Sequence, residues 1–272
     1  MYATDFEYDG QYLSSYGFII CDFDYSSGST IANAGSKLTF NKVARNNGKQ
    51  FSLTSAKYDE CIQTTFDICK NPDIYENYED RQITNDEYID LMRWLNRREF
   101  LKFHVLSENE GVPICYYNVS FNIEKIKIAE KLFGLRLTME SDKPFGYGIE
   151  QSVSWTFENS SSIKILSDTS NEIGYLYPDM TITCNANGDL SIHNDLEKCT
   201  MTINGCSIGE VITINGSAQI ISTSYDSHDI ANDFNYEFFR IGNTINNRNN
   251  RISVSIPCSM VIRYTPIIKD AI

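Results

Sequence analysis

The sequence predicts a β-rich protein in which an α+β domain with one main helix precedes an all-β sandwich. Three observations support this prediction. Only residues 84–98 have strong helical periodicity, short segments of alternating apolar and polar residues fill most of the remainder, and a stretch with proline and two glycines at 141–148 separates two parts of different character. The chain has 272 residues, which is enough for two domains, and we place them at 1–145 and 149–272.

The helix is predicted by its start, its stripe and its end. Thr84 and Glu87 have the spacing of a capping box, in which each side chain accepts a hydrogen bond from the backbone of the other residue. An apolar stripe with spacing i, i+3, i+4 and i+7 follows, made of Tyr88, Leu91, Met92 and Leu95. After residue 98 the period changes from 3.6 to 2, so a strand through 103–105 is expected next.

The rest of the first part alternates like strands joined by turns. An opening strand and turn are expected within 2–25, with the turn at Asp9-Gly10. Residues 26–36 are small and polar and predict a loop, and Asn47-Gly48 predicts the turn of a hairpin. Further strands are expected at 61–68, 103–106, 114–123 and 132–139.

The second part contains no convincing helical pattern. Asn187-Gly188, Asn204-Gly205 and Asn215-Gly216 are each expected to form a turn between two alternating segments. Many short strands with turn signals every 8 to 12 residues are typical of a β-sandwich.

Composition excludes several classes of function. The net charge is −13, and the sequence contains no basic stripe that could hold phosphates. Tight nucleic-acid binding is therefore not expected. The first residues lack the pattern of a signal peptide, and no apolar run is long enough to cross a bilayer, so we expect neither export nor a membrane span. The eight cysteines are spread singly, without metal-ligand spacing to the three histidines, and are expected to be buried free thiols in a reducing cytosol.

The residues with catalytic chemistry do not form a convincing site. Ser227, His228 and Asp229 are adjacent on a polar segment, where neighbouring side chains point apart, so a triad is not expected. His104 lies in an apolar strand and is interpreted as a core or interface histidine. Two acidic pairs, Asp59-Glu60 and Asp22-x-Asp24, could supply a general acid and a general base only if their two carboxyl groups had different pKa values. Neither pair has a partner in the sequence that would make them differ.

Two other motifs have simple structural interpretations. The segment NANGD, residues 185–189, superficially resembles a calcium loop but lacks the downstream bidentate glutamate, so a hairpin turn is favoured. The N-x-S/T sequences at Asn118, Asn159 and Asn215 mean little without secretion. The sequence therefore predicts no catalytic, cofactor-binding or metal-binding residues, no cofactor and no enzymatic activity.

Several segments, taken in order, resemble the distal tail protein (Dit) family of siphophage-type bacteriophages. The resemblance spans nearly the whole chain, and it rests on the succession of segments and not on any single motif. Those segments are FEYDG and YGFII near the start, TNDEYIDLMRWLNRREFLKF, LFGLRLTMESDKPFGYG, Tyr177-Pro178, Asn187-Gly188, GEVITING, FFRIGNTI and MVIRYTP. One departure is the polar NNRNNR after Ile245, which is longer than expected for that hairpin.

The resemblance implies a function that composition alone does not. It implies a belt domain at 1–145 that closes into a hexameric ring, and a galectin-like sandwich at 149–272. Such a ring joins the tail tube protein to the tip or baseplate, contacts the tail-tip or tail-associated protein, and docks fibre or receptor-binding proteins. The expected location is the tail of the virion, assembled in the bacterial host cytoplasm.

The resemblance also gives the net charge a second meaning. Tape-measure protein and later DNA would pass through the lumen of the ring without specific binding. Six copies at −13 each carry −78, so an acidic lumen would repel DNA phosphates.

Two functions from other classes remain open at this point. The first is a carbohydrate-binding module for host recognition, for which Trp155 is the one tryptophan in the second part. The second is a tail-associated hydrolase, against which the lack of a nucleophile or metal constellation already argues.

Overall fold

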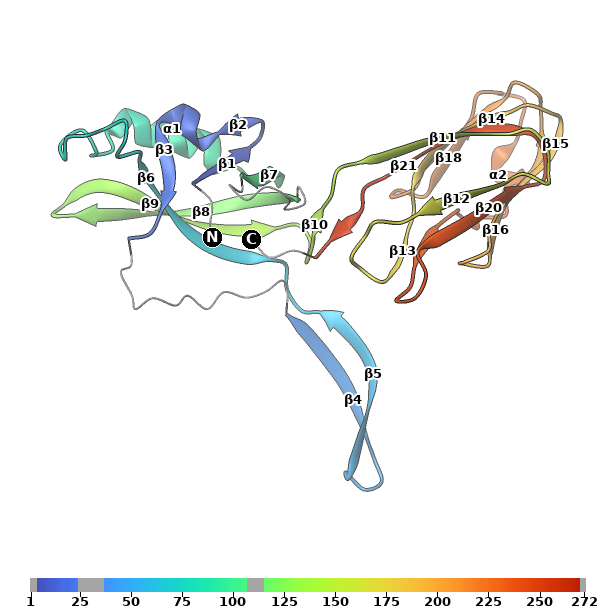
Figure 1. Cartoon of the computed structure of the whole chain (residues 1–272), viewed down its shortest axis with the longest axis horizontal. Helices are drawn as coiled ribbons and strands as arrows, with labels where there is room; N and C mark the ends of the chain where they lie inside the picture. The colour runs from blue at the N-terminus through green and yellow to red at the C-terminus, as the bar shows by residue number, and fades with distance from the viewer. Residues whose placement is uncertain (1–3, 24–36, 107–114, 270–272) are drawn as a thin grey trace. The chain divides into compact units, whose positions relative to one another are not determined.

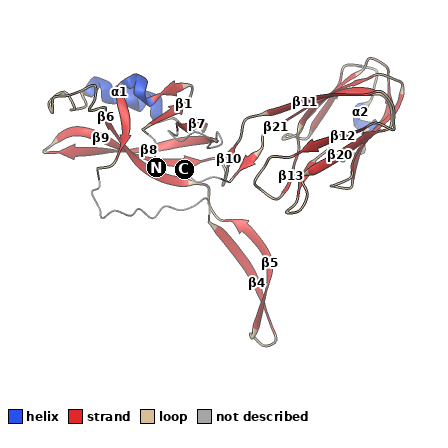
Figure 2. Ribbon diagram, viewed as in Figure 1, coloured by secondary structure: helices blue, strands red, loops and turns tan. Residues whose placement is uncertain are grey.

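The computed structural model describes residues 4–23, 37–106 and 115–269 (Figure 1). The predicted loop at 26–36, Asp24 and Ile114 lie outside these residues. The chain divides into two compact units, one that runs to Tyr147 and includes Lys269, and one from Gly148 to Ile268. Strands dominate both units, as Figure 2 shows, which confirms the β-rich fold class.

The first unit is built on one large antiparallel sheet with the strand order β2-β1-β7-β8-β9-β6-β3. A separate hairpin, β4-β5, pairs with no other described strand. The elements of this unit are β1 (Asp5–Tyr8), β2 (Gln11–Tyr12), η1 (Leu13–Tyr16), β3 (Phe18–Cys21), β4 (Leu38–Arg45), β5 (Gln50–Tyr58), β6 (Gln63–Lys70), α1 (Asn85–Leu95), β7 (Leu101–Leu106), β8 (Tyr116–Ile128), β9 (Lys131–Ser141) and β10 (Gly146–Tyr147).

Helix α1 forms as predicted and is held by polar contacts at its start. The Thr84 side chain accepts from the Glu87 backbone, and Glu87 accepts from the Thr84 backbone, so the capping box is complete. Glu87 also pairs at 2.7 Å with Lys70, a buried lysine of β6. The helix is thereby fixed at its N-terminus to the sheet.

The buried face of α1 matches only half of the predicted stripe. Leu91 and Leu95 are buried, but the third buried residue is Trp94, while Tyr88 and Met92 are only partly covered. Trp94 stacks on Tyr16 with ring centroids 4.6 Å apart and donates from Nε1 to the Tyr8 carbonyl at 3.0 Å. An indole is buried here because its N–H finds a partner.

The second unit is a sandwich of two antiparallel sheets with strand orders β11-β21-β14-β17-β18 and β12-β20-β15-β16. Its core is one cluster of side chains contributed by both sheets, among them Phe157, Ile182, Ile192, Ile203 and Ile262. The elements are β11 (Gln151–Phe157), β12 (Ile163–Ser167), β13 (Gly174–Leu176), β14 (Asp179–Cys184), β15 (Gly188–Asn194), β16 (Cys199–Cys206), β17 (Val211–Asn215), β18 (Ile220–Thr223), α2 (Ile230–Asp233), β19 (Ile241–Asn243), β20 (Asn249–Val254), β21 (Cys258–Tyr264) and β22 (Ile267–Ile268).

Three details of the sequence interpretation were wrong. Asn204-Gly205 is not a turn, because β16 continues to Cys206 and these two residues bulge opposite Asp189, whose Oδ1 accepts from the Gly205 backbone. The second unit contains one short helix, α2, which had no sequence signal. The stretch 141–148 was expected to lack regular structure, but it contains the short strand β10, in which Tyr147 pairs with Tyr116 of β8.

The polar segment NNRNNR after Ile245, longer than expected for that hairpin, forms only a short loop in the structure. Thr244 and Asn247 close a tight turn through their backbone groups, and β20 has already begun at Asn249. Most of the NNRNNR segment is therefore turn and strand, and one of its asparagines, Asn250, is fully buried.

Candidate functional site

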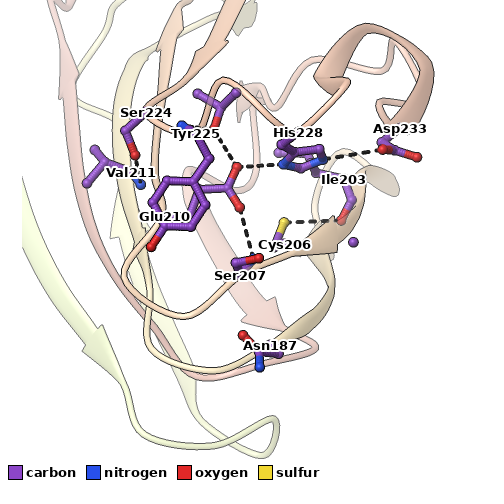
Figure 3. Close-up of polar contacts among 12 residues, drawn as sticks. Asn187, Ile203, Cys206, Ser207, Glu210, Val211, Ser224, Tyr225, His228 and Asp233 are labelled. Carbon is purple, nitrogen blue, oxygen red and sulfur yellow. Dashed lines mark hydrogen bonds and ion pairs between the residues drawn. The ribbon is translucent and has the colours of Figure 1, made fainter.

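A buried polar cluster in the second unit surrounds Glu210, the residue before β17 (Figure 3). The Glu210 carboxylate accepts from the Ser207 backbone at 2.9 Å and from the Thr223 hydroxyl. His228 Nδ1 lies 2.5 Å from Glu210 Oε1, and His228 Nε2 lies 3.4 Å from Asp233 Oδ2 of α2. The cluster therefore connects the turn before β17, the end of β18 and α2.

The two central groups shift each other's pKa values. Burial alone would lower the pKa of His228, but the hydrogen bond and charge of Glu210 outweigh it and hold that pKa above its ordinary value. Burial would raise the pKa of Glu210, but the hydrogen bonds from Thr223, Ser207 and His228 outweigh it and hold that pKa low. The pair therefore favours a protonated His228 beside an ionised Glu210.

The cluster stabilises structure and has no catalytic arrangement. The sequence interpretation placed His228 on an exposed loop, and this was wrong, since only 7% of its side chain is exposed. Ser227 and Asp229 are exposed, and Asp229 accepts from Asn232 of α2 at 2.6 Å. The imidazole nitrogens face the carboxylates of Glu210 and Asp233, not Ser227 or Asp229, so the three adjacent residues form no triad. Glu210 was missed because nothing near it in sequence identifies its partner.

The remaining candidate residues have structural positions. The NANGD segment joins β14 to β15, but these strands lie in different sheets and do not pair, so the predicted hairpin turn was wrong. Asn187 accepts from the Ile208 backbone. His104 of β7 contacts the Cys115 carbonyl at 3.0 Å, and Asp22, Asp59 and Glu60 are exposed. The three asparagines of the N-x-S/T sequences, at 118, 159 and 215, take part in hydrogen bonds.

Trp155 bears on the carbohydrate-binding alternative. Its ring packs against the core of the sandwich. The ring centroids of Trp155 and Phe157 lie 6.2 Å apart in an edge-on contact. At least part of this ring is thus used in packing the sandwich.

Within the described ranges, no group of three or more histidine, cysteine, aspartate or glutamate side chains could hold a metal ion. No helix among the described residues has the length and apolar character needed to span a bilayer. The cysteines are free thiols; Cys21, Cys61 and Cys69 are only partly buried, which differs from the prediction that all eight are buried.

The most unusual surface of the first unit is the hairpin β4-β5. Cross-strand partners lie on the same face of a ribbon, and here the face that carries Leu38 and Phe40 also carries Tyr58 and Ala56. Between Asn41 and Lys42 the register shifts, because Thr54 of β5 is an extra residue. The shift moves Phe51 and Leu53 onto the same face as Leu38 and Phe40.

The result is an amphipathic ribbon whose apolar face is open to solvent. Phe51 is 65% exposed and Leu53 is 58% exposed, and Leu38 and Phe40 are also exposed. Val43 lies on the opposite face, which is otherwise polar. A two-stranded hairpin with its apolar face uncovered is at best marginally stable in water, so this ribbon has the properties of a contact surface for another molecule.

Comparisons with known proteins agree for both units. A family model described as a phage tail protein N-terminal domain matches residues 1–143, and one described as a phage tail C-terminal domain matches residues 145–264. No curated protein matches the chain significantly.

Among solved structures, the chain is similar to the crystal structure of SPP1 Dit (gp 19.1). That protein is described as a paradigm of the hub adsorption apparatus in phages that infect Gram-positive bacteria. The TM-score is 0.64 at 12% sequence identity, and the alignment covers 96% of this chain and 98% of that one. The fold of this chain is thus Dit-like. With both of its parts matched by the family models, the chain belongs to this family of phage tail proteins.

Proposed function

We propose that this chain is a distal tail protein, a structural tail component that forms a hexameric ring and joins the tail tube to the tip or baseplate. The observation that carries the proposal is the similarity to SPP1 Dit over nearly the full length of both chains, so that both units are matched together. In this proposal residues 1–145 are the belt domain that closes the ring. Residues 149–272 are the galectin-like domain that docks fibre or receptor-binding proteins.

The proposed partners follow from a position at the end of the tail. Copies of the same chain are the first partner, the tail tube protein binds one side of the ring, and the tail-tip or tail-associated protein binds the other. The protein assembles in the bacterial host cytoplasm and remains in the virion. In this proposal it acts without catalysis, and the Glu210–His228 cluster holds loops together.

The β4-β5 hairpin is the proposed contact between neighbouring copies. Its apolar face carries Leu38, Phe40, Phe51 and Leu53, each 43–65% exposed. Covering the exposed part of one such side chain stabilises an interface by about 1 kcal/mol. Six copies in a closed ring would each cover one neighbour's hairpin, which accounts for an apolar surface that is too exposed for an isolated chain.

The test is the mass of the purified protein by light scattering at several concentrations. The proposal expects a hexamer or a pair of hexamers, built from subunits of 31.1 kDa. Because closure can require the growing tail, the second measurement is cryo-electron microscopy of tails from the phage or prophage that encodes this chain. Density for this chain away from the distal end, or with a symmetry other than sixfold, contradicts the proposal. A neutral or basic lumen in that ring would contradict the acidic-lumen hypothesis alone.

A further inference from the structure

Two cysteines of the first unit lie together on the same face of its large sheet. Strand β3 is the last described strand at one end of this sheet and pairs with β6, with Cys21 opposite Asp67 and Ile19 opposite Cys69. Cys21 and Cys69 are therefore diagonal neighbours on one face. Both are free thiols and only partly buried.

The two thiols affect each other's ionisation. Their mutual interaction lowers the pKa of Cys69 and raises that of Cys21. Burial opposes thiolate formation at both, and the charge of Arg81 lowers the pKa of Cys69 further. Asp67 opposes the thiolate, but its own charge is paired with Arg136 through contacts of 2.8 and 3.0 Å.

A second thiol pair in the same chain supplies a comparison. Cys184 of β14 and Cys206 of β16 also shift each other's pKa values, but they lie at the interior of the sandwich, 1% and 2% exposed. A thiol must be accessible as well as partly ionised to react. The chain thus contains one partly exposed pair and one buried pair of interacting thiols.

We propose that Cys21 and Cys69 form a reversible disulfide that ties strand β3 to β6 once the protein leaves a reducing environment. A virion protein experiences this change, because particles released from a host enter an oxidising medium. With an azo oxidant such as diamide, the Cys69 thiolate adds to the N=N bond. The Cys21 sulfur then attacks the Cys69 sulfur and displaces the hydrazine, which carries away both thiol protons.

The geometry requires a small movement of the chain. The sulfurs must close to about 2.05 Å, and diagonal positions are about 7–8 Å apart at Cα, beyond the usual disulfide range of about 4.4–6.8 Å, so the backbone must move. Strand β3 has four residues and no further described strand on its other side, so it can move toward β6 more easily than an interior strand.

The experiment uses the full chain, reduced, desalted and exposed to diamide, followed by alkylation with N-ethylmaleimide under denaturing conditions and peptide mapping by mass spectrometry. The expected result is a linked Cys21–Cys69 peptide that is lighter by two hydrogens, with Cys184 and Cys206 alkylated. Oxidation should raise the melting temperature of the first unit by about 5 °C, and dithiothreitol should reverse the change.

Variants separate the outcomes. Cys69→Ser should abolish both the linked peptide and the melting shift, while Cys61→Ser, at the third partly exposed thiol of this unit, should leave both unchanged. The proposal is overturned if Cys21 and Cys69 stay alkylated after oxidation, if they link only to other chains, or if Cys184–Cys206 oxidises first. Should the serine variants not fold, the peptide map of the unaltered chain decides alone.

Discussion

Asn194 donates a hydrogen bond from Nδ2 to Oδ1 of Asn250 at 2.8 Å, and both side chains are fully buried in the sandwich. Asn250 in turn donates from Nδ2 to the carbonyls of Leu166, Gly242 and Arg248 and accepts from the Gly242 backbone. One amide group thus links β12, β19 and β20. A buried polar group is stable only when its partners are present, so this position tolerates little change.

Asn250→Asp tests this network. The substitution keeps the size of the side chain but replaces an NH₂ donor by an oxygen, which leaves carbonyls unsatisfied and places a charge at a site with no exposure. We expect a loss of about 3 kcal/mol or more in the free energy of unfolding, measured with urea. Asn249→Asp, at the exposed neighbouring residue, should change it by less than about 0.5 kcal/mol. Equal effects of the two variants would contradict the role of Asn250.

The Glu210–His228 pair predicts a pH dependence of stability. The pKa of His228 is raised above 6.5, so its stabilising effect is complete below pH 6.5 and is lost as pH rises through the raised value. The pKa of Glu210 is lowered below 4.5, so its effect is complete above pH 4.5 and is lost as pH falls through the lowered value. Melting temperatures of the second unit should therefore be highest between pH 4.5 and 6.5.

Substitution of His228 checks the alkaline side of this dependence. His228→Gln should lower the stability of the second unit and remove the decline in stability above pH 6.5. The control is His193→Gln, at a partly exposed histidine, which should retain that decline. If the His228 variant showed the same decline in stability above pH 6.5, another titrating group would be responsible for it.

The hairpin predicts a face-specific effect on assembly. Phe51→Ser together with Leu53→Ser removes two exposed apolar side chains from one face, while Val43→Ser removes one from the other face. If the apolar face is the contact between copies, the double variant should shift the light-scattering mass toward monomer at concentrations where the Val43 variant remains assembled. Because these residues are exposed, all variants should melt at nearly the temperature of the unaltered chain. Equal loss of assembly from both faces would contradict a contact through the apolar face.

The capping box predicts a modest effect in the first unit. Thr84→Ala removes the side-chain acceptor for the Glu87 backbone and should cost about 1 kcal/mol of unfolding free energy. Asn85→Ala, one residue further on and exposed, should be nearly neutral. Chemical denaturation followed by Trp94 fluorescence measures both variants, because that indole belongs to the same helix and is buried.

A close backbone approach predicts the cost of a single methyl group. A Cβ on Gly216 would lie 2.3 Å from the Tyr177 carbonyl oxygen and 2.4 Å from that of Pro178, and neither atom can rotate away as a side chain can. Gly216→Ala should therefore lower the stability of the second unit by about 2 kcal/mol. Gly148→Ala, whose Cβ would make only ordinary contacts, is the control. Similar melting temperatures for both variants would contradict this prediction.

Local patterns predicted the elements whose determinants are local. The capping box and apolar periodicity predicted α1, and Asn47-Gly48 predicted the β4-β5 turn, because both signals lie within a few residues. Asn204-Gly205 has the same residue types but forms a bulge, since the pairing of β15 with β16 decides its conformation. Dipeptide chemistry alone cannot distinguish these two outcomes.

The polar clusters could not be predicted from the sequence, because the residues that form them are far apart along the chain. Glu210 meets His228 across 18 residues, and Asn194 meets Asn250 across 56. Neither residue carries a local feature that distinguishes it from a solvated neighbour. Their importance exists only after the two sheets have packed, which places both side chains where water cannot reach them.

The extra residue at Thr54 makes the two faces of the hairpin depend on its bulge. If Thr54 paired regularly with Lys42, Leu53 would lie opposite Val43 and Phe51 opposite Arg45, so both would rotate to the face that carries Val43. Deleting Thr54 would instead leave a regular ladder, with Leu53 still opposite Lys42 and Phe51 still opposite Ala44. The surplus residue thus keeps two apolar segments of one strand in phase, and a slip of the ladder by one step would scramble the ribbon's surfaces more thoroughly than most substitutions could.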